Sequence, residues 1–186
     1  MLYAKKCAKC YVEKPVTAFD VNSKTKDGRY PNCKECRYKH RRTPVAKAKQ
    51  AVYRARHERI KYETKLGTPI KDDLNSREVA FVFGEGYCSY CQKPLDYSNA
   101  TLDHLVALSR GGENTFENVV GACGSCNTSK QDKPVLLHML QSCEPYANRK
   151  LLERLALRKG CEVSQVYEEL VADVQNYLAN QSKVGV

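Results

Sequence analysis

The sequence of residues 88–133 is CSYCQKPLDYSNATLDHLVALSRGGENTFENVVGACGSCNTSKQDK. It begins with one C-x-x-C pair, Cys88/Cys91, and has a second pair, Cys123/Cys126, near its end. Cysteines at this spacing are typical ligands of a tetrahedral zinc ion. The stretch is therefore predicted to fold around a zinc site.

A second set of cysteine pairs precedes this stretch. Cys7/Cys10 and Cys33/Cys36 are separated by 22 residues with few apolar side chains, too few to form a core without a metal. A structural zinc ion contributes roughly 10 kcal/mol or more of folding free energy. A redox dithiol and a disulfide framework are the alternatives to zinc. The ligands of the two predicted structural zinc ions are Cys7, Cys10, Cys33, Cys36, Cys88, Cys91, Cys123 and Cys126.

Polar side chains that suit the hydrolysis of a phosphodiester bond lie between and directly after the second set of cysteine pairs. Asp103 and His104 are adjacent, Asn118 stands five residues before Cys123, and Asn127 follows the last cysteine. The reaction needs a base that activates water and a cation that neutralises charge in the transition state. Taken singly, each residue has a structural explanation, such as a buried histidine, a turn or a helix cap. The four together favour a nuclease site.

The stretch resembles the HNH (ββα-metal) endonuclease family in its cysteine pairs, the Asp-His dipeptide between them, the double glycine and the Cys-Asn junction. The resemblance implies an α+β fold of small zinc-stabilised modules, with a ββα-metal HNH core and flanking helices. It also implies an enzyme, a metal-dependent DNA endonuclease that uses one metal ion. The Cys-Asn junction and the N-terminal zinc-knuckle module resemble those of phage-type nucleases. The Gly-Gly-x-Asn-Thr stretch is similar to the restriction and homing branches, so the branch stays open.

The resemblance also implies roles for the polar residues. His104 is the general base, since an imidazole has a pKa near neutrality, and Asn118 orients its ring. Asp103 and Asn127 bind a catalytic Mg²⁺ or Mn²⁺ ion through oxygen atoms. Asn114 is the alternative to Asn118, although the sequence Gly-Gly-Glu-Asn is also typical of a turn.

The net charge of +10 favours a polyanionic partner, which we expect to be DNA. Residues 1–36 have a net charge of +4, residues 37–65 of +9 and residues 66–186 of −3. DNA affinity is therefore predicted to lie mainly in residues 37–65; the alternative is a solvated linker helix whose lysines confer solubility. The predicted DNA contacts, the last two from their place in the family motif, are Arg41, Arg42, Lys47, Lys49, Arg54, Arg56, Arg59, Lys61, Arg110 and Lys130.

Helix signals divide the chain. Thr43 before Pro44 predicts the start of a helix and Gly67 its end, while Asn75 and Glu78 predict a capping box at the start of another. Four segments are predicted: an N-terminal four-cysteine zinc module at 1–42, a basic linker helix at 43–67, the HNH nuclease domain at 75–135 and a C-terminal helical extension at 136–186.

Other expectations concern the chain as a whole. It has no apolar stretch of membrane-spanning length and no secretory signal, so we expect a soluble, cytoplasmic protein with no membrane partner, for which a phage gene in a bacterial host is one fitting origin. Cys143 and Cys161 are predicted core thiols, and the C-terminal helices are expected to stabilise the core, with homodimer contact left open. Two other classes stay open: a non-catalytic zinc-dependent nucleic-acid-binding protein, and an RNA-binding module that stacks bases on its tyrosines.

Overall fold

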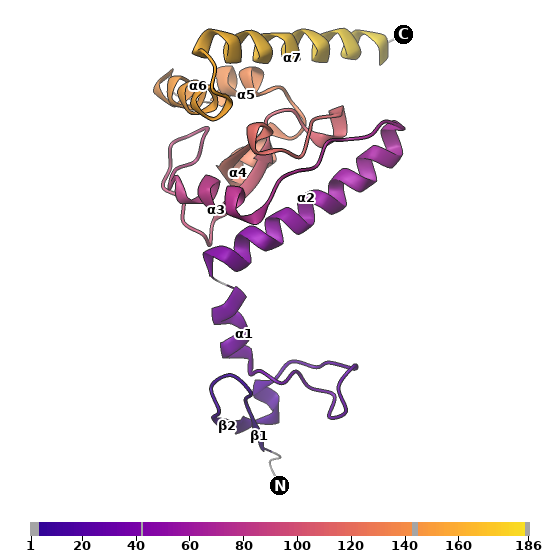
Figure 1. Cartoon of the computed structure of the whole chain (residues 1–186), viewed down its shortest axis with the longest axis vertical. Coiled ribbons are helices and arrows are strands. Elements are labelled where there is room, and N and C mark those ends of the chain that lie inside the picture. Colours follow the sequence, from indigo (N-terminus) through magenta and orange to yellow (C-terminus); the bar gives the residue numbers. More distant parts are fainter. Residues whose placement is uncertain (1–3, 42, 143–144, 185–186) are drawn as a thin grey trace. The chain divides into compact units, whose positions relative to one another are not determined.

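The computed structural model describes residues 4–41, 43–142 and 145–184 (Figure 1). It divides into two compact units, Met1–Ala46 and Lys47–Val186. Arg42 and Cys143, for which a DNA contact and a core position are predicted, lie outside the described residues, as does the side chain of Arg41. Within the described part of the chain, no helix combines the length and the apolar character needed to cross a membrane.

The first unit is held together by very few apolar side chains. Phe19 is fully buried, and it packs with the equally buried Cys7 and Cys33. A cluster of this size is too small to stabilise a fold alone, so this unit needs additional stabilisation from a connection between its cysteine pairs. The elements of this unit are an antiparallel strand pair, a 3₁₀ turn and a helix: β1 (Ala4–Lys6), β2 (Glu13–Pro15), η1 (Val16–Ala18) and α1 (Lys34–Arg41).

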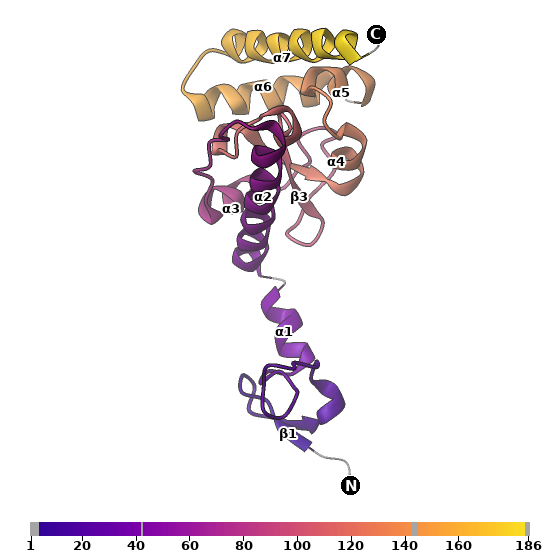
Figure 2. The ribbon, with the colours of Figure 1, turned by 90° about the vertical axis from the view of Figure 1, so that its right-hand side faces the viewer.

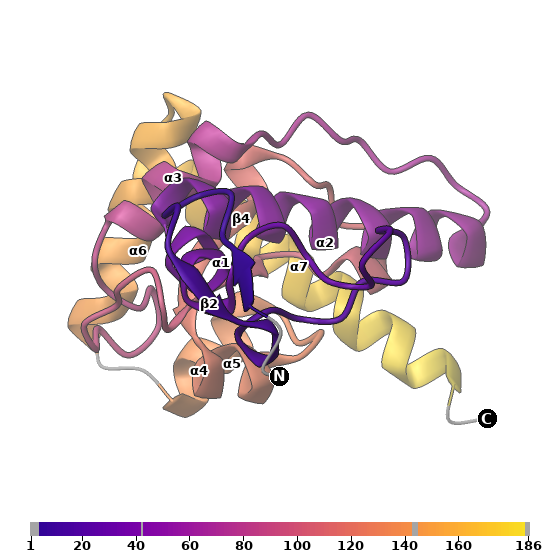
Figure 3. The same ribbon diagram turned by 90° about the horizontal axis from the view of Figure 1, so that it is seen from below.

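Helix α2 (Pro44–Leu66) contributes one face to the core of the second unit. Its residues Ala48 and Val52, four positions apart, are buried in that core. The helix lies alongside the β-hairpin of this unit (Figures 2 and 3). It ends at Gly67, whose φ of 68° lies in the left-handed region that favours glycine. Most of α2 is therefore an integral part of the second unit, in contrast to the separate linker helix predicted.

Helix α3 (Ser76–Gly84) begins with the capping box that the sequence predicts. The Asn75 side chain accepts a hydrogen bond of 3.2 Å from the Glu78 amide, and the Asn75 amide donates one of 3.0 Å to the Glu78 carboxylate. Its buried residues Val82 and Phe83 belong to the same core as α2. The core therefore connects both helices to the hairpin.

The centre of the second unit is a β-hairpin followed directly by a short helix. Strand β3 (Ala100–His104) pairs antiparallel with β4 (Val119–Cys123), and α4 (Gly124–Lys130) follows β4 and packs against β3. The predicted α+β class is confirmed by this arrangement. The connection between the strands contains two 3₁₀ turns, η2 (Leu108–Arg110) and η3 (Phe116–Asn118).

Three helices complete the unit, and α7 lies over α5 and α6 (Figures 1 and 2). Leu155 and Leu170 join the main core. Arg158 donates a hydrogen bond of 2.7 Å to the carbonyl oxygen of Val119 at the start of β4. The C-terminal helices thus support the hairpin directly; their bounds are α5 (Val135–Ser142), α6 (Pro145–Lys159) and α7 (Val163–Val184).

Candidate active site

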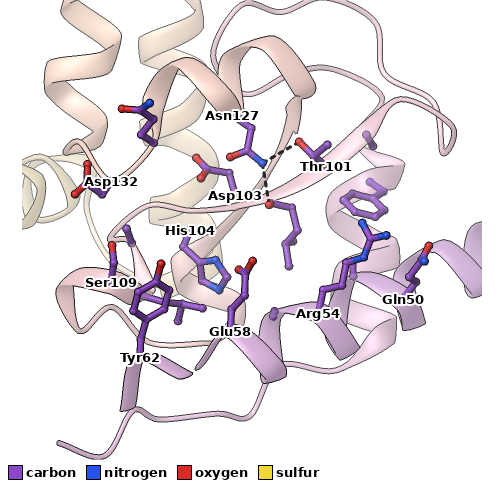
Figure 4. Close-up of a pocket in the computed structure, with 18 of the residues that line it drawn as sticks. Gln50, Arg54, Glu58, Tyr62, Thr101, Asp103, His104, Ser109, Asn127 and Asp132 are labelled. Carbon is purple, nitrogen blue, oxygen red and sulfur yellow. Dashed lines mark hydrogen bonds between the residues drawn. The ribbon is translucent and has the colours of Figure 1, made fainter. Parts of the chain in front are cut away.

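The loop end of the hairpin brings three of the predicted site residues together. Asp103 and His104 are the last two residues of β3, and Asn127 lies in α4, which packs against that strand. All three line one cleft (Figure 4). Consecutive side chains of a strand point to opposite sides, and Asp103 and His104 accordingly make separate sets of contacts.

The Asp103 carboxylate is held from within the protein. It is only 5% exposed, and its Oδ2 accepts a hydrogen bond from the Tyr90 hydroxyl. Lys130 Nζ lies 3.3 Å from the same oxygen. The carboxylate is thus fixed in position before any ligand binds.

Lys130 is a structural cation in this site. Its side chain is fully buried, and its ammonium group donates a hydrogen bond of 2.7 Å to the carbonyl oxygen of His104. Burial lowers the pKa of Lys130, against the attraction of Asp103. The DNA contact predicted for Lys130 is wrong, because a fully buried ammonium that is bonded to the strand cannot reach a phosphate.

Asn127 is oriented by its amide nitrogen. Nδ2 donates hydrogen bonds to Thr101 Oγ1 at 3.1 Å and to the Leu102 carbonyl oxygen at 3.2 Å. The amide oxygen is consequently turned toward the Asp103 carboxylate (Figure 4). A carboxylate and an amide oxygen side by side are ligands that suit Mg²⁺ or Mn²⁺, so these two residues fit a hard divalent cation.

The His104 ring is nearly buried and, within the described residues, makes a single side-chain hydrogen bond. Its Nε2 lies 3.0 Å from Asn114 Oδ1. Burial lowers the pKa of His104 below its usual value, although the Asn114 hydrogen bond and the nearby Asp103 charge act in the opposite direction. A lowered pKa keeps the ring neutral, and therefore able to accept a proton, at ordinary pH.

The ring contact predicted for Asn118 is made by Asn114 instead. Asn118 closes the connection between the strands: its Oδ1 accepts from the Val106 amide at 2.9 Å, and its Nδ2 donates to the Val106 carbonyl at 3.0 Å. The chain turns back at Gly112, where a Cβ atom would lie 1.9 Å from the Val106 carbonyl oxygen. This close approach places Asn114, and not Asn118, at the histidine.

The cleft has a volume of about 720 Å³, and α2 forms one of its walls. Glu58 of α2 points toward the His104 ring (Figure 4), and its charge raises the pKa of that ring slightly against the larger effect of burial. The cations on this wall are Lys47, Arg54 and Lys65. A cleft with a potential base, an oxygen-rich corner and a cationic wall is suited to a phosphodiester.

The comparison with known families agrees with this geometry. The family model described as HNH endonuclease matches residues 88–133. These residues are an HNH endonuclease domain. A CRISPR-associated endonuclease Cas9 from Corynebacterium diphtheriae is 44% identical over 48 residues, which are 25% of this chain and 4% of that protein. This chain therefore spans only a small part of that relative's length.

Among solved structures, the Type II-C Cas9 enzyme from Actinomyces naeslundii is similar to this chain. The match covers 78% of this chain and 15% of the Cas9 chain, with 18% sequence identity and a TM-score of 0.38.

The four cysteines of the HNH domain form one cluster, with all sulfur atoms within 4.8 Å of one another. Cys91 Sγ and Cys123 Sγ are 3.8 Å apart. A tetrahedron with metal–sulfur bonds of about 2.3 Å has edges of about 3.8 Å. Burial opposes ionisation of Cys123, but hydrogen bonds from Ser125 and Cys126 outweigh it and lower its pKa to about 6. The geometry and the readily ionised thiol fit a zinc ion.

The cysteines of the first unit form a second cluster of the same kind. Cys7, Cys10, Cys33 and Cys36 also lie within 4.8 Å of one another. Burial opposes ionisation of Cys7, but backbone amide donors lower its pKa to about 6, whereas burial and the neighbouring thiols raise that of Cys36 to about 12. All four thiols could ionise together only with a cation among them, so this cluster also fits a zinc ion. Cys161, predicted to be a core thiol, is partly buried against the main core.

The other predicted DNA contacts have different surroundings. Lys47 and Arg54 line the cleft of the HNH domain, and Lys49 and Lys61 are exposed on α2. Arg110 is wrong as a DNA contact, because both of its terminal nitrogens bind the Asp173 carboxylate, at 2.7 and 2.9 Å.

The remaining two predicted contacts, Arg56 and Arg59, face the carboxylate of Asp72, at 3.6 and 3.2 Å. Sequence reasoning did not single out Asp72, Tyr90 or Glu58. Tyr90 lies inside a C-x-x-C pair, where a partner for Asp103 could have been suspected. Asp72 and Glu58 lie outside the HNH motif, and no sequence signal identifies them.

Proposed function

We propose that this chain is a metal-dependent DNA endonuclease that hydrolyses phosphodiester bonds, with His104 as the general base. The observation that carries the proposal is the meeting of His104, Asp103 and Asn127 in one cleft beside a cationic helix. A protein that only binds nucleic acid has no need for a base and two oxygen ligands at a common point.

His104 would take the proton from the attacking water. Its ring is held by Asn114 on one nitrogen, which leaves the other for the water. Because burial lowers its pKa, the ring is neutral before the reaction. Burial also restricts the ring to one orientation, and such positioning lowers the activation barrier.

Asp103 and Asn127 would hold the catalytic Mg²⁺ or Mn²⁺ ion. When bound, this ion supplies positive charge that stabilises the phosphate in the transition state and the leaving oxygen. Tyr90 and Lys130 fix the carboxylate of Asp103, and Thr101 fixes the amide of Asn127. The chain thus presents both oxygen ligands without rearrangement.

The two cysteine clusters would bind structural zinc. Four thiolates close the coordination sphere of zinc and leave no position for water, so the zinc ions have no catalytic role. DNA would be held by the cations of α2, with Lys47 and Arg54 in the cleft and Lys49 and Lys61 beside it. A homodimer and a cytoplasmic location stay predictions.

The proposal is tested by incubating plasmid DNA with the zinc-loaded protein and Mg²⁺ or Mn²⁺, and measuring nicked and linear products. His104→Ala should reduce cleavage by about 10² to 10⁴-fold without loss of DNA binding. His57→Ala is the matched control, since His57 is an exposed histidine of α2 and does not line the cleft. Absence of cleavage by folded wild-type protein with either metal would favour the non-catalytic binding protein.

A further inference from the structure

A chain of four side chains leads from helix α2 to the proposed base. Arg59 Nε lies 3.2 Å from Asp72 Oδ2, and Asn114 Nδ2 donates a hydrogen bond of 2.7 Å to Asp72 Oδ1. Asn114 Oδ1 lies 3.0 Å from His104 Nε2. We propose that Asp72, held by Arg59, is a positioning residue that determines which nitrogen of His104 acts as the base. This inference rests on the proposed function.

The backbone fixes Asn114 before its side chain acts. The Asn114 amide donates to the Lys71 carbonyl oxygen at 2.9 Å, and its carbonyl oxygen accepts from the Leu74 amide at 3.1 Å. Asn114 is fully buried, so its side-chain amide has no access to water. Only the orientation of the amide group remains to be decided, and neighbouring side chains decide it.

The chemistry of donors and acceptors decides this orientation. An ionised carboxylate only accepts hydrogen bonds, so Asp72 must face the NH₂ group of Asn114. The Asn114 oxygen then faces His104, and an amide oxygen also only accepts. The neutral His104 ring must therefore carry its proton on Nε2. Nδ1, which makes no hydrogen bond within the described part of the chain, keeps the lone pair that accepts a proton from water.

Helix α2 completes the chain at its other end. Asp72 Oδ2 faces Arg59 and, at 3.6 Å, Arg56, and both are donors only. Asp72 is half-buried and does not line the cleft, so it does not touch a substrate there. It lies outside the HNH domain at 88–133. Its effect on the reaction would therefore pass entirely through Asn114.

This chain of contacts predicts the effect of Asp72→Asn, which keeps the shape of the side chain. The arginines require an acceptor, so the new side-chain amide at position 72 would turn its oxygen toward Arg59 and its NH₂ group toward Asn114. The Asn114 amide would then reverse and donate to His104 Nε2. The ring proton would move to Nδ1, and the base nitrogen would be blocked.

The test uses full-length, zinc-loaded protein with ¹⁵N-labelled histidine, without Mg²⁺ and at a pH above the histidine pKa. Long-range ¹H–¹⁵N spectra report which nitrogen of His104 is protonated, and His104→Ala identifies its signals. Wild type should show protonated Nε2, and Asp72→Asn should show protonated Nδ1. The kcat for plasmid cleavage should fall by about 10² to 10⁴-fold with little change in KM.

The matched control is Asp73→Asn, which makes the same substitution at the next residue, an exposed aspartate that pairs with Lys71. It should change neither the tautomer nor kcat. Protonated Nδ1 in wild type, or an unchanged tautomer and kcat in Asp72→Asn, would overturn the inference. If the wild-type protein did not cut DNA but Asp72→Asn still shifted the tautomer of His104, the role of Asp72 would be supported and the proposed function refuted.

Discussion

Lys130 Nζ lies 3.3 Å from Asp103 Oδ2, and neither side chain has appreciable contact with solvent. The same carboxylate is the proposed ligand of the catalytic metal. A buried ammonium group at this distance neutralises Asp103 while no metal is bound. It also repels a cation that approaches the same oxygen atoms. Lys130 is therefore expected to stabilise the fold and to weaken metal binding.

Lys130→Met should separate these two effects. Loss of one partner of a buried ion pair typically costs about 3 to 5 kcal/mol, so the free energy of unfolding without Mn²⁺ should fall by roughly this amount. The Mn²⁺ concentration needed for half-maximal protection against unfolding should fall as well. Denaturation curves measured over a Mn²⁺ series test both effects.

The control for this substitution is Lys133→Met, which removes the same charge three residues further along, at a position that is only half-buried. It should leave stability and Mn²⁺ protection close to wild type. If Lys130→Met instead weakened Mn²⁺ binding, Lys130 would have to help the metal site and not compete with it.

A second prediction concerns the pH dependence of cleavage. Burial lowers the pKa of His104 below 6.5, and the base must be neutral to accept a proton. The neutral form is fully present above the lowered pKa and is lost as the pH falls through it. We therefore expect the acid limb of kcat, measured at saturating Mn²⁺, to be centred below pH 6.5, the usual value for histidine. An acid limb centred above 6.5 would contradict a buried base.

Chemistry could be predicted from the sequence better than geometry. The cysteine clusters follow from the C-x-x-C spacing, whereas a common site for Asp103, His104 and Asn127 is implied by the resemblance to the HNH family. The sequence favours Asn118 over Asn114, because the context of Asn114 is typical of a turn. Asn114 does lie in a turn, and it also contacts His104, because the turn at Gly112 brings it back to the histidine. Spacing alone does not give the direction of a turn.

The prediction of DNA contacts was wrong for two cations because it considered their charge and not their burial. Lys130 and Arg110 are both basic residues in the nuclease motif, yet both are bound internally, to Asp103 and Asp173. The sequence does not identify Asp72 as a site residue for a related reason. Its contact with Asn114 joins residues 42 positions apart, and such pairings depend on the packed structure.

The third prediction is that each chain binds two zinc ions independently. The clusters lie in different units, so loss of one should leave the other intact. Cys7→Ser should reduce the zinc content from two to one and unfold the first unit, since a structural zinc contributes roughly 10 kcal/mol. The protein should keep its Mn²⁺-dependent cleavage, because the cleft and the cations that line it belong to the second unit.

Cys88→Ser provides the reciprocal test. It should also leave one zinc ion but remove cleavage, because Cys88 lies in the HNH domain. Metal analysis and cleavage assays on both variants give the comparison. A wild-type content of one zinc ion or none, on folded protein, would refute the prediction.

The last prediction concerns the cations of α2 that line the cleft. Each phosphate neutralised by a cation contributes about −0.9 to the slope of log affinity against log salt concentration. Since α2 buries Ala48 and Val52 in the core, removing the helix would disturb the fold, and substitutions are the better test. Lys47→Ala with Arg54→Ala should flatten the slope by about 1.8 if both residues contact the backbone of DNA.

The comparison uses a His104→Ala background, so that DNA stays intact, and one duplex across a salt series. Lys49→Ala with Lys61→Ala removes the same charge from exposed positions of α2 that do not line the cleft. If DNA enters the cleft, the first pair should flatten the slope more than the second, because of these four cations Lys47 and Arg54 are the two that line the cleft. Equal changes would mean that α2 attracts DNA only through its overall charge, and no change in either pair would mean that the helix does not contact DNA at all.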